Sequence, residues 1–178
     1  MKKTILTIFI ALAAVHAGFA QTTKEANPTD VSSLDAIMKS VYDVISGDAG
    51  KPRDWDRFRS LFANDARLIP VRKDPQSGSF SIQKYTAEEY IQRASGFFAK
   101  EGFYEREAAR RVEQYGHIAH VFSTYESRHA ASDKTPFARG INSFQLFNDG
   151  KRWWVVTIYW DAETPDSPIP QKYLKSGK

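Results

Sequence analysis

The sequence lacks cysteine entirely and has only four histidines among its 178 residues. Without cysteine there is no disulfide scaffold, no thiol nucleophile and no lipid-modified N-terminal cysteine. No two histidines are spaced as metal ligands on a helix, and no cluster of carboxylates suggests a site for a hard cation. The sequence therefore predicts neither a metal site nor a cofactor.

An excess of charge of one sign is also missing. The formal net charge is +4. It falls to +2 without Lys2 and Lys3, which lie in an N-terminal segment that is described below as a predicted signal peptide. No stripe of basic residues with interleaved aromatics runs along any predicted element. We therefore expect no nucleic-acid partner.

Long apolar runs are absent except near the N-terminus. There, Lys2 and Lys3 precede an apolar stretch from Ile5 to Val15, and Gly18-Phe19-Ala20 matches a cleavage site. The stretch is shorter than the ~20 residues of a comfortable membrane span, which favours a cleaved signal peptide over an uncleaved anchor. The sequence predicts a signal peptide over residues 1–20, cleavage near Ala20, no transmembrane span after processing, and a secreted or periplasmic protein.

Three helices are predicted in the first hundred residues, from apolar side chains that recur every three or four positions. The first runs from Leu34 to Ile45, the second from Trp55 to Phe62, and the third around Tyr90 to Phe98, after a capping box formed by Thr86 and Glu89. Residues 21–30 are polar and are expected to be a flexible lead-in. A strand over residues 66–71 separates the second and third helices.

From residue 103 onward the pattern is β: two long runs separated at Gly116, a loop over residues 130–136, and a hairpin with Asn148-Asp149-Gly150 at its turn. Residues 163–178 are rich in proline and are expected to be a loosely attached tail. Helices followed by a meander indicate one α+β domain over residues 31–162. Such a long, mainly antiparallel sheet can curve strongly around helices that pack on one face.

Two short motifs carry a resemblance to a known family. Leu61-Phe62-Ala63-Asn64-Asp65-Ala66 is similar to the LYADDA-type turn of the nuclear transport factor 2-like superfamily, and the DGKRWWVV segment from Asp149 resembles its closing strand. The superfamily includes SnoaL-like cyclases, scytalone dehydratase and ketosteroid isomerases. The resemblance implies a cystatin-like cone with an internal pocket, often dimerised through the outer face of the sheet.

The predicted hairpin assigns residues to the two faces of the sheet. A two-residue turn at Asp149-Gly150 pairs Leu146 with Trp153 and Phe144 with Val155. The same pairing predicts a pocket lined by Asn142, Thr157 and Tyr159. The opposite face would carry Ile141, Trp154, Val156, Ile158 and Trp160, which favours a homodimer through this face; coverage by the protein's own tail is the alternative.

The ketosteroid isomerase mechanism is not supported, because the position that corresponds to the family's base is Pro70. Tyr42 is also two positions away from the family's first-helix tyrosine. The candidates that remain for acid–base catalysis are Glu126, Tyr125 and His120. His120 is more simply a strand histidine with ordinary hydrogen bonds than a general base, because the sequence identifies no partner that would support catalysis.

Glu126 and Arg128 share one face of a strand, where they would either grip a ligand inside the cone or form an ordinary ion pair. Trp55 is more simply a core residue than a pocket wall. The predicted ligand-binding residues are Trp55, Asn142, Thr157, Tyr159, Glu126 and Arg128. Three functions stay open: an exported small-molecule-binding protein, a SnoaL-like cyclase, isomerase or dehydratase, and an interaction protein whose cavity is filled.

Overall fold

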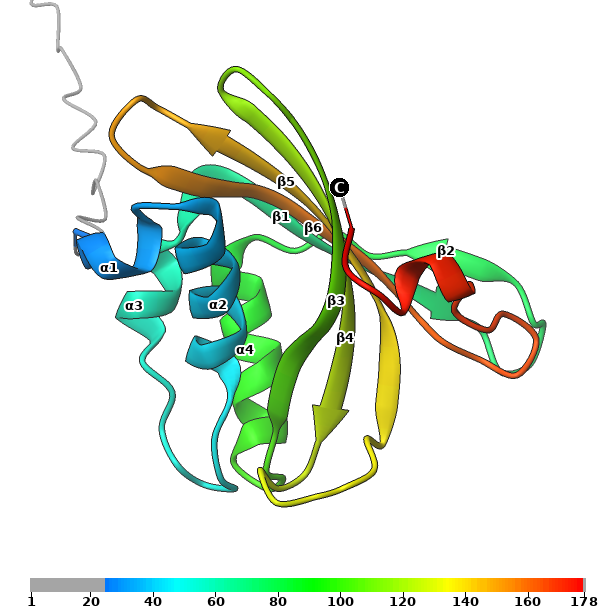
Figure 1. Ribbon diagram of the computed structural model, residues 1–178. Helices are drawn as coiled ribbons and strands as arrows, with labels where there is room; N and C mark the ends of the chain where they lie inside the picture. Colours follow the sequence, from blue (N-terminus) through cyan, green and yellow to red (C-terminus); the bar gives the residue numbers. More distant parts are fainter. Residues whose placement is uncertain (1–24, 178) are drawn as a thin grey trace, which may run out of the picture.

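A computed structural model describes residues 25–177 of the chain. Four helices, α1 (Pro28–Val31), α2 (Leu34–Ile45), α3 (Trp55–Ser60) and α4 (Ala87–Phe98), lie on one side of a curved sheet (Figure 1). The strands are β1 (Phe62–Lys73), β2 (Phe80–Ile82), β3 (Tyr104–Tyr115), β4 (Ile118–Arg128), β5 (Ala138–Asn148) and β6 (Trp153–Ala162). This is the α+β cone that the sequence predicts.

The helices begin where local chemistry places them. Asn27, Ser33 and Asp54 accept hydrogen bonds from backbone N–H groups in the first turns of α1, α2 and α3. Thr86 and Glu89 form the predicted capping box at the start of α4. The short helix α1 was not predicted; its four residues overlap the segment that was expected to be a flexible lead-in. The predicted signal peptide lies outside the described residues.

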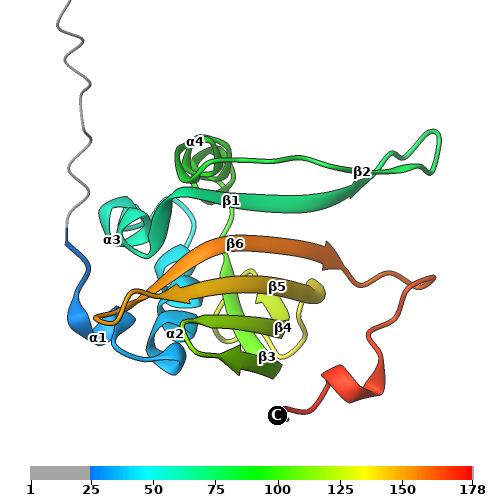
Figure 2. The same cartoon turned by 90° about the horizontal axis from the view of Figure 1, so that it is seen from above.

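The six strands form one sheet in the order β2-β1-β6-β5-β4-β3. All neighbouring pairs are antiparallel except β1 and β6, which run parallel. The connection between these two strands includes α4 and the other strands, and is long enough for the crossover that a parallel pair needs. Seen from above, the strands splay and twist so that the sheet curls around α2 (Figure 2). The concave face of this sheet is the inner wall of the cone.

The core lies between the helices and the concave face of the sheet. Ile37 and Met38 of α2, Phe58 of α3, and Val121, Phe144 and Val155 of the sheet are all almost fully buried. Phe58 stacks on Tyr90 of α4 with ring centroids 5.4 Å apart. These contacts anchor α3 and α4 and keep the helix layer at a fixed distance from the sheet.

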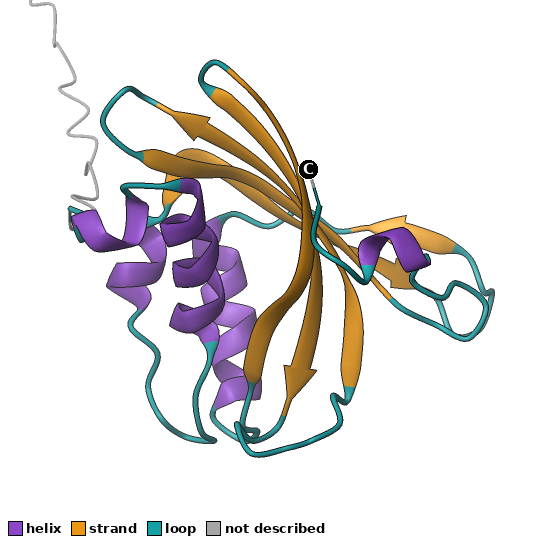
Figure 3. Cartoon of the chain, viewed as in Figure 1, coloured by secondary structure: helices purple, strands orange, loops and turns teal. Residues whose placement is uncertain are grey.

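The C-terminal segment is not loosely attached, as the tail was predicted to be. It lies on the convex face of the sheet, opposite the helices, where it forms the one-turn 3₁₀ helix η1 (Gln171–Tyr173) (Figure 3). Thr124 of β4 donates a hydrogen bond of 2.6 Å to the Tyr173 carbonyl, and the Arg111 guanidinium donates to the Lys172 carbonyl. Ile169 is 9% exposed, so an apolar anchor accompanies these hydrogen bonds.

Candidate functional site

A cavity of about 340 Å³ lies inside the cone, between the helices and the concave face of the sheet. Its walls come from α2, α3, α4 and from every strand except β2. The volume is at the small end of the range for ligand pockets, ~300–1,000 Å³. Its apolar lining includes the aromatic side chains Phe58, Tyr90, Phe103, Phe137, Phe144 and Trp160.

A cluster of polar side chains interrupts this apolar lining. Glu105 of β3 accepts a hydrogen bond of 2.8 Å from the Ser127 hydroxyl, and the Asn142 amide nitrogen lies 3.5 Å from its other carboxylate oxygen. The same amide nitrogen is 3.1 Å from the Tyr42 hydroxyl. Tyr125 of β4 is a third tyrosine of the cavity wall, besides Tyr42 and Tyr90. An apolar chamber with a few convergent polar groups is the usual form of a small-molecule site.

Enclosure in this chamber raises the pKa of Glu105 to about 7, because the charged carboxylate loses most of its contact with water. The hydrogen bonds from Ser127 and Asn142 oppose part of this shift. Burial, together with the nearby Glu105 charge, raises the pKa of Tyr42 and of Tyr125 well above their usual range, so both hydroxyls stay neutral. Glu105 is therefore the group of the cavity that titrates near neutral pH.

Two of the residues predicted from sequence, Asn142 and Tyr125, lie in the cavity. Gly140 makes room for the Tyr125 ring, since a Cβ at Gly140 would lie 2.5 Å from the Tyr125 hydroxyl oxygen. Trp55 does not line the cavity; it stacks on Phe98 and meets Phe58 edge-on, as a residue of the helix layer.

The other candidates on β4 lie on the convex face, because alternate residues of a strand point to opposite sides. Glu126 is held by Arg128 at 2.8 Å and by Arg106 at 2.9 Å, and Arg128 lowers the pKa of Glu126. His120 lies 3.1 Å from the Ser143 hydroxyl and 3.3 Å from Glu113. Glu126 and Arg128 thus form an ion pair outside the cavity.

The predicted register of the hairpin is wrong. The connection spans four residues, with Asn148 paired to Trp153, and Asp149 accepts hydrogen bonds from the backbone N–H groups of Lys151 and Arg152. A bulge on β6 then shifts the pairing again: Leu146 pairs with Val155 and Gln145 with Thr157, so Val156 has no partner on β5. An inserted residue exchanges the two faces of everything beyond it.

As a result, the residues predicted for the two faces of β6 are partly exchanged. Ile158 pairs with Phe144 and Trp160 with Asn142, so both face the cavity rather than a partner subunit. Thr157 and Tyr159, predicted as pocket residues, point to the convex face, where Tyr159 is 43% exposed. Ile141, Trp154 and Val156 stay on the convex face as predicted.

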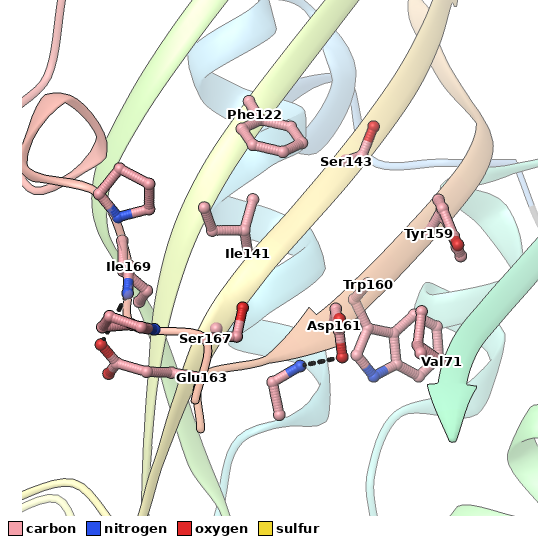
Figure 4. A pocket seen from close by; sticks show the side chains of 14 residues that line it. Val71, Phe122, Ile141, Ser143, Tyr159, Trp160, Asp161, Glu163, Ser167 and Ile169 are labelled. Atoms are coloured by element: carbon pink, nitrogen blue, oxygen red, sulfur yellow. Dashed lines mark hydrogen bonds between the residues drawn. The ribbon is translucent and has the colours of Figure 1, made fainter. Parts of the chain in front are cut away.

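Tyr159 borders a second hollow, of about 280 Å³, on the convex face (Figure 4). The sheet contributes Phe122, Ile141 and Ser143 to its wall, and the C-terminal segment contributes Ile169 and neighbouring residues. The Glu163 carboxylate in this wall accepts a hydrogen bond of 2.9 Å from the Ile169 backbone N–H, which ties down the segment itself. We therefore regard the cavity inside the cone, with its convergent polar groups, as the candidate site.

Sequence reasoning missed Glu105, which lies within an alternating polar run that reads as a solvated strand. The signal that could have found it is its pairing opposite Ser127, a neighbour of Tyr125 on the same strand. A bulge between Glu107 and Ala109 changes the face of β3 part-way along, and counting from the turn at Gly116 does not reveal it.

Within residues 25–177, no group of three or more histidine or carboxylate side chains could hold a metal ion. In the same part of the chain, no helix has the length and apolar character needed to cross a membrane.

No protein-family model and no curated protein matches the sequence. Solved structures do match it. A protein of unknown function with a cystatin-like fold from Nostoc punctiforme superposes with a TM-score of 0.55 at 13% identity, over 80% of this chain and 97% of that one. An NTF2-like protein of unknown function from Silicibacter pomeroyi gives 0.52 at 14% identity, over 74% and 94% of the two chains.

A third match, an NTF2-like protein from Cytophaga hutchinsonii, gives a TM-score of 0.52 at 16% identity, over 72% of this chain and 97% of that one. The protein therefore has an α+β cone of the cystatin-like class. More particularly, it has the nuclear transport factor 2-like fold, which confirms the fold predicted from the LFANDA and DGKRWWVV motifs.

Proposed function

We propose that this is an exported protein that binds a small, partly apolar organic molecule inside the cone. The observation that supports this most directly is the cavity itself, an apolar chamber in which Glu105, Asn142 and Tyr125 converge. Another function that the sequence leaves open is that of an interaction protein with a filled cavity. It fits less well, because about 340 Å³ is open between the helices and the sheet.

The acid–base enzyme is the second candidate, and it depends on Glu105. A pKa of about 7 suits a group that exchanges protons at neutral pH. His120 and Glu126, two of the catalytic residues predicted from sequence, lie outside the cavity, so neither takes part in this candidate. Binding is the simpler proposal, since it needs only the chamber and its polar groups.

A blocked cavity should not retain ligand. Ala138 lies in the cavity wall, and Ala138→Phe is expected to fill part of the chamber and lower the bound fraction at least about tenfold. Native mass spectrometry of protein recovered from the exported fraction checks this, and a polypeptide mass starting at Gln21 would establish export. The matched control is Gln145→Phe, which adds the same side chain to the exposed face of β5. Equal bound mass in both variants would count against the cavity as the site.

We also propose a homodimer through the convex face, now without Ile158 and Trp160. Near the β5–β6 hairpin, beyond the C-terminal segment, Ile118, Phe147 and Val156 are 62%, 42% and 38% exposed, and Trp154 lies beside Phe147. Such a group of apolar side chains is typical of an interface. Val156→Glu is expected to convert a dimer to a monomer in sedimentation velocity. Wild-type protein that sediments as a monomer at ~100 µM would contradict the dimer.

A further inference from the structure

The buried hydrogen bonds beside the cavity form one chain with a fixed direction. Glu107 is a carboxylate held 2.7 Å from the Arg110 guanidinium, and it accepts a hydrogen bond of 2.6 Å from the Ser123 hydroxyl. A serine hydroxyl has one hydrogen to donate. The Tyr42 hydroxyl, 2.7 Å from Ser123, must therefore donate its own hydrogen to the Ser123 oxygen.

This direction also fixes the amide of Asn142. Since the hydrogen of Tyr42 is already used, its oxygen accepts from the Asn142 amide nitrogen at 3.1 Å. The opposite orientation of the amide would place the Asn142 carbonyl oxygen against two acceptors, the Tyr42 oxygen and the Glu105 carboxylate. The Asn142 carbonyl oxygen is thus left to the cavity, and no hydrogen bond from residues 25–177 reaches it.

Glu105 completes the same end of the cavity and has no cationic partner among the described residues. The one basic side chain of the cavity wall, Arg72, is exposed to solvent and makes no ion pair with Glu105. A carboxylate enclosed by apolar walls is unfavourable unless a positive charge faces it. The aromatic rings of Tyr90, Phe103 and Trp160 also line these walls, and aromatic rings can attract a cation.

We propose that the cavity selects small organic amines, with the ammonium group placed between the Glu105 carboxylate and the Asn142 carbonyl oxygen and the apolar body among the aromatic side chains. This inference rests on the proposed function, and it narrows the ligand to one chemical class. The Tyr42 hydroxyl offers no donor to a ligand carbonyl, because its hydrogen is committed to Ser123.

Binding of an ammonium would be linked to the ionisation of Glu105. In the free protein, enclosure raises the pKa of Glu105 to about 7, so at pH 6.5 the carboxyl is mostly protonated. A bound cation lowers that pKa and expels the proton. We expect titration calorimetry at pH 6.5 in two buffers with different ionisation enthalpies, phosphate and MES, to give different binding enthalpies. The difference should correspond to the release of a fraction of one proton for each amine bound.

The test compares four probes of one size at pH 7.5: 2-phenylethylamine, 2-phenylethanol, phenylacetone and phenylacetate. The amine is expected to bind at least about tenfold more tightly than the alcohol and the ketone, and the acid is expected to bind more weakly still. Glu105→Gln, which keeps the shape of the side chain, is expected to remove the preference for the amine, so that the ratio of the amine and alcohol affinities falls to within about threefold of one.

The outcomes distinguish a failure of the amine assignment from a failure of the proposed small-molecule binding. If the alcohol or the acid binds as tightly as the amine, or if Glu105→Gln keeps the amine preference, the cavity binds small molecules but the assignment to amines falls. If none of the four probes binds, the proposed function falls with it. Because the proton release is measured on the wild-type protein, this part of the test does not depend on whether the variant folds.

Discussion

Replacing Arg53 with alanine is expected to lower the free energy of unfolding by about 3–5 kcal/mol, measured by urea denaturation. The Arg53 side chain is 7% exposed and lies inside the loop that joins α2 to α3. It donates hydrogen bonds to the carbonyl oxygens of Ile45, Gly47, Asp48 and Lys51, at 2.8, 2.7, 3.2 and 2.7 Å. Its guanidinium also lies 4.8 Å from the centre of the Phe98 ring of α4.

The effect is large because one side chain donates hydrogen bonds to four backbone carbonyl groups in and beside the loop. Without the guanidinium, several part-buried carbonyl groups lose their donor at once, and each such loss costs about 1–3 kcal/mol. Arg53→Lys keeps the charge but cannot form the planar array of bonds, and we expect about half of the loss. Arg93→Ala, at an exposed position on α4, is the control, expected below ~1 kcal/mol. An Arg53→Ala protein as stable as this control would show that water replaces the guanidinium.

The helices could be predicted from sequence because their determinants are local. The apolar spacing of α2 and the capping box at Thr86 and Glu89 lie within a few residues of the elements they define. The short helix α1 was missed, although Asn27 and Pro28 supply a cap and a first-turn proline. Its four residues are too few to show a period of 3.6, and its anchor, the pair between Asp30 and Arg57, is distant in sequence.

The sheet could be predicted only in outline, because its faces depend on bulges that alternation does not reveal. Asn142 was assigned to the inner face correctly, since β5 alternates without interruption from there to Leu146. On β6 the unpaired Val156 reverses the assignment, so Trp160 lies inside and Tyr159 outside. An apolar run gives no sign of the reversal, because residues on both faces are aromatic or aliphatic.

The carboxylate that lines the cavity was missed for a related reason. The base position that the resemblance implies is Pro70, which is buried on β1 opposite Trp160. In this chain the cavity carboxylate comes instead from Glu105 on β3, the strand at the opposite edge of the sheet from β1 and β2. Residues so distant in sequence are brought together only by strand pairing, and a single-sequence pattern does not specify which pairing occurs.

Glu105→Gln is expected to make the protein more stable at pH 8 than the wild type, by up to about 3 kcal/mol. The pKa of Glu105 rises from an ordinary 4.5 to about 7 in the folded protein, so the folded state holds this proton more tightly than the unfolded chain does. Below about pH 4.5 the carboxyl is protonated in both states, and the charge has no effect. As the pH rises toward 7, the unfolded chain ionises freely while the folded protein resists.

The wild type should therefore lose stability between about pH 4.5 and 7, and the loss is complete above 7. Glutamine cannot ionise, so the difference between the variant and the wild type isolates Glu105 from every other titrating group. Urea denaturation of both proteins at pH 5, 6, 7 and 8 measures that difference, which should grow with pH and then level off. Two parallel profiles would mean that water reaches the carboxylate in the native state. A growing difference, by contrast, would show that the cone keeps Glu105 at a free-energy cost which a bound cation is suited to offset.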